Sequence, residues 1–188
     1  MNAPVSHPVE GAPPISVAAL FHLMELGIID PEARFELVEG EIVRRAPHGS
    51  LHQSLQRWLH KKLTIALSDR FWVAPGSTLI LPEYTALDPD ICVYPLDVET
   101  KDLSGEKVSL LVEIAHASRS YDLGRKAALY ARMGAPELWV VDAAAKVTHV
   151  HRGPGEGVWS EVRIVRADED FSPLIAPVVK LRISESGV

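Results

Sequence analysis

The stretch that decides the fold is LLVEIAHASRSYDLGRKAALYARMGAPELWVVD, residues 110–142. Its first six residues are apolar on both faces of a strand except for Glu113, which indicates a central strand covered from both sides. A helix is predicted from about Ser120 to Met133, because Gly134 can end it and Pro136 forbids its continuation. The segment ELWVVDA then predicts a second strand. The stretch is therefore a strand, a helix and a strand.

The elements on either side of this unit follow from similar patterns. Upstream, the sequence predicts a helix that Ser16 caps and Gly27 ends, a hairpin around a Glu39-Gly40 turn, and a helix from Ser50 to about Asp69. Three β-rich segments come next, WVAPGSTLILP, DPDICVYP and VSLLVEIA, and two further strands, KVTHVHR and VWSEVRIV, follow the central unit. This order predicts an α/β fold with a mixed central sheet flanked by helices.

The beginning of the chain differs from the rest in composition. Residues 1–14, MNAPVSHPVEGAPP, hold four prolines and almost no large apolar side chains, so burial cannot offset the entropy lost on ordering. They are predicted to form a flexible N-terminal tail. With 188 residues and 47% hydrophobic content, the chain is long enough to bury a core, and residues 15–188 are predicted to form one domain.

Composition also limits the compartment and the partners. Cys92 is the only cysteine and no secretory leader pattern begins the chain, which predicts a cytoplasmic protein. Charges interrupt every apolar stretch before the roughly 20 residues that span a bilayer, so no membrane segment is expected. The net charge of −6 argues against a surface that attracts nucleic acid everywhere, but a local basic cleft is compatible with it. Two basic groups are interpreted as solvated helix faces: Arg119, Arg125, Lys126 and Arg132, and Arg57, Lys61 and Lys62.

Glu113 is the first candidate for chemistry. A carboxylate in a strand buried on both faces costs several kcal/mol unless it is neutralised, paired or bound to a metal. Glu113 lies near the carboxyl end of its strand, where open α/β sheets build their sites. Both a structural ion pair and a functional site explain its presence at this point.

Two more residues complete a possible site. Asp90 follows Pro89 and by itself is typical of a turn, but on a strand next to that of Glu113 it allows two carboxylates to converge on Mg²⁺. Lys126 lies four residues after Asp122, the spacing of an ordinary surface pair. The helix follows the strand of Glu113 closely, however, so Lys126 can also reach the strand end. An acidic pair, a divalent ion and a lysine suit phosphodiester hydrolysis.

Several segments resemble the Uma-two family of bacterial endonucleases, whose fold belongs to the PD-(D/E)xK nuclease superfamily. They are FELVEGEIV, PDICVY and the central stretch, so the resemblance runs from about Phe35 to Asp142. It implies a restriction-endonuclease-like fold and a divalent metal ion, Mg²⁺ or Mn²⁺. It also implies that Asp90, Glu113 and the backbone carbonyl of Ile114 are the metal ligands.

The resemblance also concerns the lysine and the supporting residues. In the superfamily motif the lysine stands two residues after the acid, where this chain has Ala115, which cannot do the chemistry. The Uma-two pattern places it on the following helix, which matches Lys126. Glu36 and His52 match further polar positions of the family. Together with Asp122, they are the supporting residues of the expected site.

The histidines allow several interpretations. The family usually has a Leu-Ser-Pro-Ser type loop after the acidic strand, and this chain has Ala-His-Ala-Ser. His116 in that loop can bind metal, move protons or merely pack, and packing is favoured for a lone histidine. A zinc pair of His48 and His52 is disfavoured, because an expected helix cap at Ser50 separates them. His149 and His151 share a strand face that is interpreted as surface.

The sequence therefore favours a Mg²⁺-dependent endonuclease that cleaves DNA, with Asp90 and Glu113 holding the metal and Lys126 assisting the attacking water. The alternative is an inactive nuclease-fold module used for binding or for homo-oligomeric assembly, which the acidic net charge supports. Cleavage of RNA or branched DNA would use the same site. A homodimer is a further possibility, since nucleases that cut two strands often act as symmetric dimers.

Overall fold

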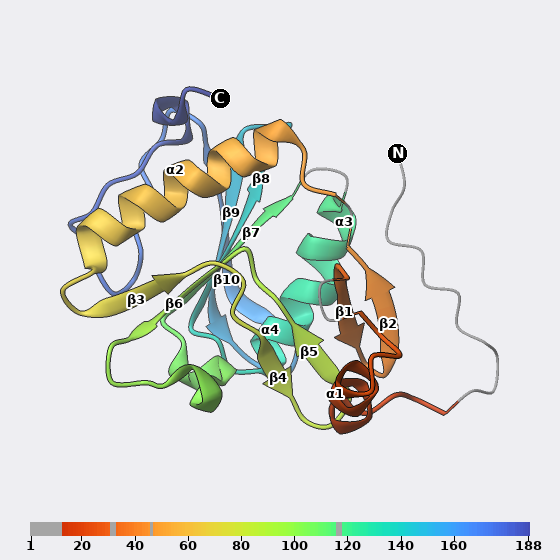
Figure 1. The fold of residues 1–188 in the computed structure, drawn as a ribbon. Coiled ribbons are helices and arrows are strands. Elements are labelled where there is room, and N and C mark those ends of the chain that lie inside the picture. Colours follow the sequence, from red (N-terminus) through yellow and green to blue (C-terminus); the bar gives the residue numbers. More distant parts are fainter. Residues whose placement is uncertain (1–12, 31–32, 46, 116–117) are drawn as a thin grey trace.

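The computed structural model describes residues 13–30, 33–45, 47–115 and 118–188. A six-stranded sheet forms its centre, in the order β10-β9-β8-β7-β6-β3 (Figure 1). β7 and β8 are parallel and the other neighbours are antiparallel, so the sheet is mixed, as predicted. The strands are β3 (Phe71–Ala74), β6 (Ile91–Pro95), β7 (Leu110–Ala115), β8 (Glu137–Asp142), β9 (Val147–Pro154) and β10 (Trp159–Arg166).

A second, four-stranded antiparallel sheet was not predicted. Its order is β2 (Glu41–Arg44), β1 (Phe35–Val38), β5 (Thr85–Leu87) and β4 (Leu79–Leu81). The segment WVAPGSTLILP, expected to be one strand, is divided between the two sheets, because β3 pairs with β6 whereas β4 pairs with β5. The predicted hairpin of β1 and β2 is present. Its turn residues Glu39 and Gly40 have φ angles of 51° and 85°, the left-handed backbone that a tight hairpin requires.

Helices cover both faces of the large sheet (Figure 1). α2 (Ser50–Leu67) packs on one face, and its buried leucines contact Val112, Trp139 and other apolar residues of the sheet. The other face carries a helical segment made of α3 (Arg119–Tyr121), a π-helical turn (Asp122–Lys126) and α4 (Ala127–Arg132). α1 (Val17–Glu25) packs on the small sheet. Short 3-10 helices are formed by Thr100–Asp102, Gly105–Lys107 and Ile183–Ser186.

The alternation of side chains along β7 decides where Glu113 lies. Val112 and Ile114 belong to the core under α2, whereas Leu111 and Ala115 belong to the core under α4. Since strand residues alternate between faces, Glu113 lies on the α4 side. The core on that side therefore carries a carboxylate directly below the helix that bears Lys126.

The histidines of β9 are placed differently from the expectation. His149 and His151 are buried, at 7% and 4% exposure, so their interpretation as surface residues was wrong. The ring of Trp159 lies 5.7 Å from that of His151. The indole N–H of Trp159 donates to the carbonyl of Ala127, so Trp159 links β10 to α4 beside His151.

Residues 1–12 lie outside the described residues, so the flexible tail and the single domain stay predictions. No described helix combines the length and apolar character needed to cross a membrane.

Candidate active site

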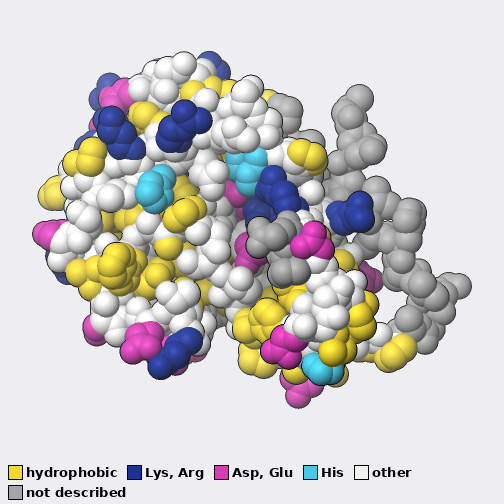
Figure 2. Space-filling view, viewed as in Figure 1, with side chains coloured by type: hydrophobic (Ala, Val, Ile, Leu, Met, Phe, Trp, Pro, Cys, Tyr) yellow, Lys and Arg dark blue, Asp and Glu magenta, His cyan; other side chains and the backbone are white. Residues whose placement is uncertain are grey.

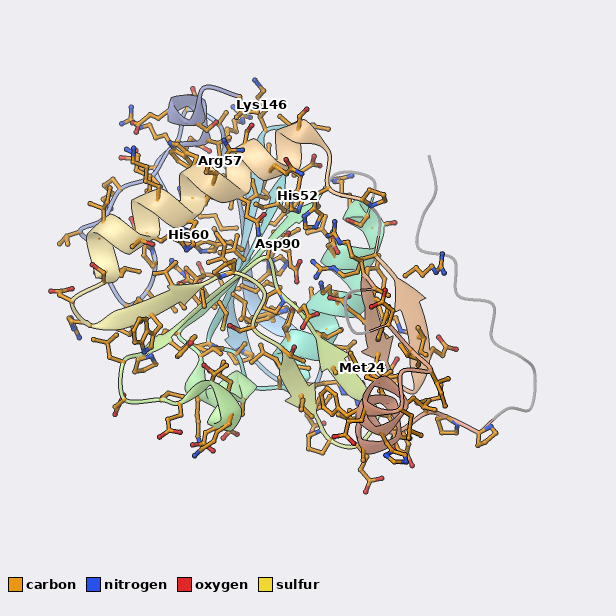
Figure 3. All side chains as sticks on the ribbon, in the orientation of Figure 1. Met24, His52, Arg57, His60, Asp90 and Lys146 are labelled. Carbon is orange, nitrogen blue, oxygen red and sulfur yellow. The ribbon has the colours of Figure 1, made fainter. Side chains whose placement is uncertain are left out.

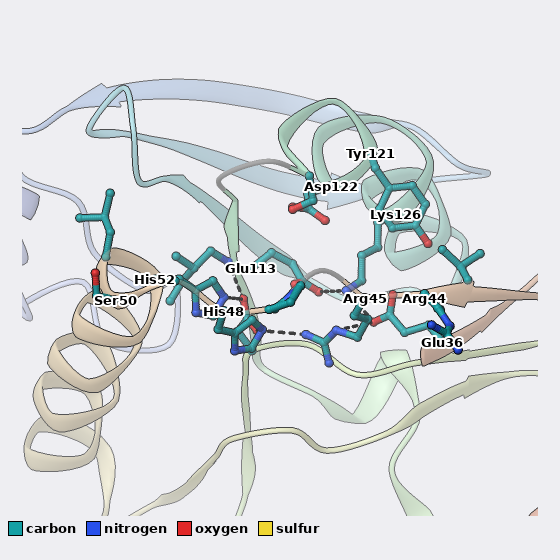
Figure 4. A pocket seen from close by; sticks show the side chains of 17 residues that line it. Glu36, Arg44, Arg45, His48, Ser50, His52, Glu113, Tyr121, Asp122 and Lys126 are labelled. Atoms are coloured by element: carbon teal, nitrogen blue, oxygen red, sulfur yellow. Dashed lines mark hydrogen bonds and ion pairs between the residues drawn. The ribbon is translucent and has the colours of Figure 1, made fainter. Parts of the chain in front are cut away.

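A cavity of about 230 Å³ lies where the small sheet, the start of α2, the ends of β6 and β7 and the α3 segment meet (Figure 4). Every residue that the sequence nominated for the site and that the structure describes lines this cavity. These residues are Glu36, His52, Asp90, Glu113, Ile114, Asp122 and Lys126. Their separation along the chain is large, so the fold brings them together.

Lys126 lies at the centre of the acidic group. Its Nζ atom is 2.7 Å from Oε1 of Glu36 and 2.7 Å from Oε1 of Glu113. With 2% exposure it is buried, so the surface-pair interpretation with Asp122 was wrong. The residue ends the π-helical turn, a wider turn that often occurs at functional sites. Burial opposes the charge, but Glu113 and Glu36 outweigh it and raise the pKa of Lys126, so the ammonium stays protonated.

Glu113 is held by two donors on one oxygen. The hydroxyl of Tyr130 donates to its Oε1 over 2.6 Å, and Lys126 contacts the same atom. Burial raises the pKa of Glu113 to about 8, Lys126 opposes that rise, and the nearby Asp90 adds to it. The carboxyl group therefore lies where more positive charge is needed to keep it ionised.

Asp90 has donors on both oxygens. The backbone N–H of Ile114 donates to Oδ2 over 2.8 Å, and Nε2 of His52 lies 2.9 Å from the same atom. Arg45 donates to Oδ1 over 3.1 Å. Burial opposes ionisation, but the hydrogen bond from His52 and the charge of Arg45 outweigh it and lower the pKa of Asp90 to about 2. Asp90 is thus ionised at neutral pH.

The backbone of Ile114 faces the same side as Asp90. In a strand, the N–H and C=O groups of one residue point toward the same neighbour. Because the N–H of Ile114 reaches Asp90, its carbonyl, the ligand that the resemblance implies, also faces Asp90.

Arg45 belongs to the site and was missed from the sequence. It directly follows β2, with Nε 3.8 Å from Oε1 of Glu36 and a guanidinium nitrogen 3.1 Å from Oδ1 of Asp90. Glu36 also accepts the backbone N–H of Asp88 over 3.1 Å and is buried, contrary to the usual exposure of strand glutamates. Arg45 thus links two carboxylates that come from different sheets. No periodic pattern marks an arginine in a connecting segment, so the sequence carried no signal for it.

His48 is the second residue that the sequence did not place in the site. Gly49, rather than Ser50, precedes the first turn of α2 as its N-cap, and the rings of His48 and His52 stack with centroids 3.6 Å apart. Nε2 of His48 lies 3.6 Å from Oδ1 of Asp90 and also contacts the guanidinium of Arg34. Burial and the neighbouring His52 lower the pKa of His48 to about 4, so it is neutral at pH 7.

The α3 side of the cavity adds hydroxyl groups. Ser118 donates to Oδ2 of Asp122 over 2.5 Å, and the buried hydroxyl of Tyr121 has no hydrogen-bond partner among the described residues. Burial is the largest cause of the raised pKa of Asp122, which Lys126 opposes. His116 falls in a pair of residues outside the described part of the chain, so its role stays open.

The donor set fits a divalent cation. Carboxylate oxygens are the ligands that Mg²⁺ and Mn²⁺ prefer. Asp90, Glu113 and the carbonyl of Ile114 are the residues that could hold such an ion. Four buried carboxyl groups line the cavity, those of Glu36, Asp90, Glu113 and Asp122.

This fold and site define a restriction-endonuclease-like α/β protein, with a mixed sheet between helices and an acidic pair beside a lysine. The chain belongs to the Uma2 family, described as "Putative restriction endonuclease", whose model matches residues 18–184. Among solved structures it is similar to the crystal structure of "a putative nuclease belonging to DUF820" from Anabaena variabilis ATCC 29413. The TM-score is 0.74 at 17% identity, with 92% of this chain and 97% of that chain covered, which shows the shared fold. A comparison with curated proteins finds no match.

Proposed function

We propose that this protein is a divalent-metal-dependent endonuclease that hydrolyses phosphodiester bonds of DNA in the cavity between the two sheets. The observation that carries the proposal is the meeting of Lys126 with Glu113, within 2.7 Å, in the same buried cavity as Asp90. Membership of a family described as "Putative restriction endonuclease", and the shared fold with a protein described as "a putative nuclease", support it.

A bound Mg²⁺ or Mn²⁺ ion would polarise a phosphoryl oxygen and lower the pKa of a water molecule. Asp90, ionised at neutral pH, supplies negative charge for such an ion, Glu113 adds a carboxyl group that the charge of the ion would help to ionise, and Ile114 adds a carbonyl oxygen. Tyr130 fixes the Glu113 carboxyl group through its 2.6 Å hydrogen bond. The carboxylates are thereby preorganised before substrate arrives.

Lys126 is the group that acts on the substrate side. An ammonium has three donors, and Glu36 and Glu113 engage two of them, which leaves one for the attacking water or a phosphoryl oxygen. Its raised pKa keeps this donor charged at pH 7 and above. Charge that develops on the phosphoryl group is therefore met by a fixed cation in a low-dielectric site.

A basic surface beside the cavity fits a polyanionic substrate despite the acidic net charge. Figure 2 shows Lys and Arg side chains next to His and acidic side chains near the centre of one face, where Figure 3 labels His52 and Asp90. Arg44 and Arg45 line the cavity itself. Phosphate contacts of this kind position a nucleic acid without reading its sequence.

The test is cleavage of supercoiled plasmid DNA with Mg²⁺ or Mn²⁺ by the wild type and by Asp90→Ala and Glu113→Gln. Nicking or linearisation by the wild type and its loss in both variants is expected. Equal cleavage by all three proteins would refute the proposal. Labelled RNA and branched DNA in parallel reactions identify the substrate, and light scattering checks for a homodimer, the state in which nucleases that cut two strands often act.

A second candidate is an inactive nuclease-fold module used for binding or assembly. One observation favours it: both oxygens of Asp90 already have donors and Glu113 already has a cation, so the carboxylates are satisfied by protein groups alone. Calorimetric titration with Mg²⁺ and Mn²⁺ separates the two functions. Mg²⁺ binding that disappears in both Asp90→Ala and Glu113→Gln supports the enzyme, and no Mg²⁺ binding supports the module.

A further inference from the structure

Two histidines and one carboxylate converge at the edge of the cavity near the start of α2. His48 precedes the helix, His52 lies in its first turn, and Asp90 precedes β6. Nε2 of His52 is 2.9 Å from Oδ2 of Asp90, and Nε2 of His48 is 3.6 Å from Oδ1. One ligand atom of each residue lies within 4.8 Å of the others. We call this group the histidine cluster.

The donor atoms of the histidine cluster differ from those of the carboxylate pair. Mg²⁺ prefers oxygen ligands and retains several waters. Imidazole nitrogen instead suits the later first-row ions, whose affinities rise from Mn²⁺ through Co²⁺ to Cu²⁺. Two imidazoles beside one ionised carboxylate are therefore a set that discriminates between ions in favour of transition metals.

We propose that His48, His52 and Asp90 bind a first-row transition-metal ion, and that they prefer Co²⁺ or Zn²⁺ to Mg²⁺. Binding as such is independent of DNA cleavage, whereas any use of this ion in catalysis rests on the proposed function. An ion bound there would use Asp90, which also belongs to the proposed site with Glu113 and Ile114. The two histidines near the start of α2 would therefore decide which metal the cavity prefers.

The surroundings of the histidine cluster are those of a ligand site. His52 is buried, and among the described residues its ring makes its polar contact with Asp90 through Nε2, whereas Nδ1, the other ring nitrogen, has no hydrogen-bond partner. Asp90 is fixed from outside by the N–H of Ile114 on its side chain and by Gln56, which donates to its carbonyl over 2.9 Å. Such outer hydrogen bonds orient the ligands of metal sites.

Arginine side chains compete with a metal ion for these ligands. Arg34 contacts Nε2 of His48, and Arg45 donates to Oδ1 of Asp90. Arg34 is exposed, so its guanidinium can move into solvent when an ion arrives. The structure therefore predicts that Arg34→Ala strengthens metal binding, whereas removal of a true ligand weakens it. These opposite signs separate a built site from general attraction of cations.

The experiment uses the full chain after treatment with a chelator. Co²⁺ is titrated and followed by its visible absorption, and Mn²⁺ and Mg²⁺ are titrated by calorimetry. His48→Ala should weaken Co²⁺ binding at least about tenfold, the lower end of the loss seen when only an outer partner of a metal ligand is removed. Its effect on Mg²⁺ should be smaller. His22→Ala is the matched control, because His22 is exposed on α1 and does not line the cavity.

Equal affinities for Co²⁺ and Mg²⁺, or Co²⁺ binding that His48→Ala and His52→Ala leave unchanged, would overturn the inference. If His52→Ala does not fold, the variants His48→Ala and Arg34→Ala still test the inference. The first, at a half-buried residue, should weaken Co²⁺ binding, and the second, at an exposed residue, should strengthen it. Glu113→Gln distinguishes this inference from the proposed function, because it removes the carboxylate that the histidine cluster does not use. Co²⁺ binding at the histidines without any DNA cleavage by the wild type refutes the nuclease and supports the histidine cluster.

Discussion

Tyr130 donates a 2.6 Å hydrogen bond to the same oxygen of Glu113 that lies 2.7 Å from Nζ of Lys126. A single carboxylate oxygen thus receives a neutral and a charged donor, both from one helical segment. Tyr130 does not line the cavity in which the substrate is expected to bind, so we regard it as a residue that positions Glu113.

Tyr130→Phe is expected to lower the free energy of unfolding by about 1–3 kcal/mol, because a buried acceptor loses a donor. Urea denaturation measures this loss. The matched control is Tyr121→Phe, whose buried hydroxyl has no partner among the described residues, so its removal should be neutral or stabilising. Equal losses in the two variants would contradict the role assigned to the Tyr130 hydroxyl. A reduced kcat with little change in KM would indicate misplacement of Glu113 rather than weaker DNA binding.

Lys126→Met is expected to abolish cleavage and to destabilise the protein by about 3–5 kcal/mol, since it leaves the buried Glu113 without its cation and Glu36 with Arg45 alone. Arg125→Ala is the control, because the neighbouring Arg125 makes exposed ion pairs with Glu39 and Glu41 that are worth less than about 1 kcal/mol each. The double variant Lys126→Met with Glu113→Gln should recover part of the stability without recovering cleavage. Additive losses would show that the pair is not coupled.

Acid is expected to destabilise the protein through the buried histidines of β9. Burial lowers the pKa of His151 and of His149 below the ordinary value of 6.5. The unfolded chain therefore takes up protons at these histidines first as the pH falls below about 6.5, so their contribution to stability is greatest above that value and declines with acid. Denaturation in urea at pH 7.5, 6.0 and 5.0 should show a smaller decline for His151→Gln than for the wild type. Parallel pH profiles would contradict the assignment.

Gly40→Ala should damage the hairpin that carries Glu36. Gly40 has φ of 85°, where a side chain costs about 1–2 kcal/mol, and an added Cβ would lie 2.3 Å from Cβ of Pro14. Gly27→Ala separates the two effects, because Gly27 has φ of 69° with no atom within 4 Å of an added Cβ. Thermal unfolding should show a larger loss for Gly40→Ala. Equal losses would mean that the segment around Pro14 gives way.

Local signals in the sequence were sufficient for the elements around residues 110–142 and for the hairpin turn, because periodicity and left-handed glycines act over a few residues. They did not divide WVAPGSTLILP between two sheets, since strand pairing depends on partners far along the chain. Lys126 was nominated because its helix follows the strand of Glu113 closely and because the family resemblance places the lysine on that helix. Its burial depends on Glu36, which comes from the other sheet.

The site residues that the sequence missed have a common reason. Arg45 and His48 lie in the connection between β2 and α2, where no period marks the side that a side chain faces. Their role depends on Asp90, which is distant in sequence. The helix cap was also predicted one residue too late. The N-cap of α2 is Gly49 instead of Ser50, and the rings of His48 and His52 stack on each other.

The ion pair between Lys126 and Glu36 has a consequence for the order in which the chain folds. Glu36 belongs to the small sheet and Lys126 to the helix on the large sheet, so their contact forms only after the two sheets have docked. Contacts between residues so distant in sequence form slowly, since the chain between them must first be ordered. The unit of β7, the helical segment and β8 is local and can form early. We therefore expect the pocket to be among the last parts of the molecule to mature and among the first to open under denaturant.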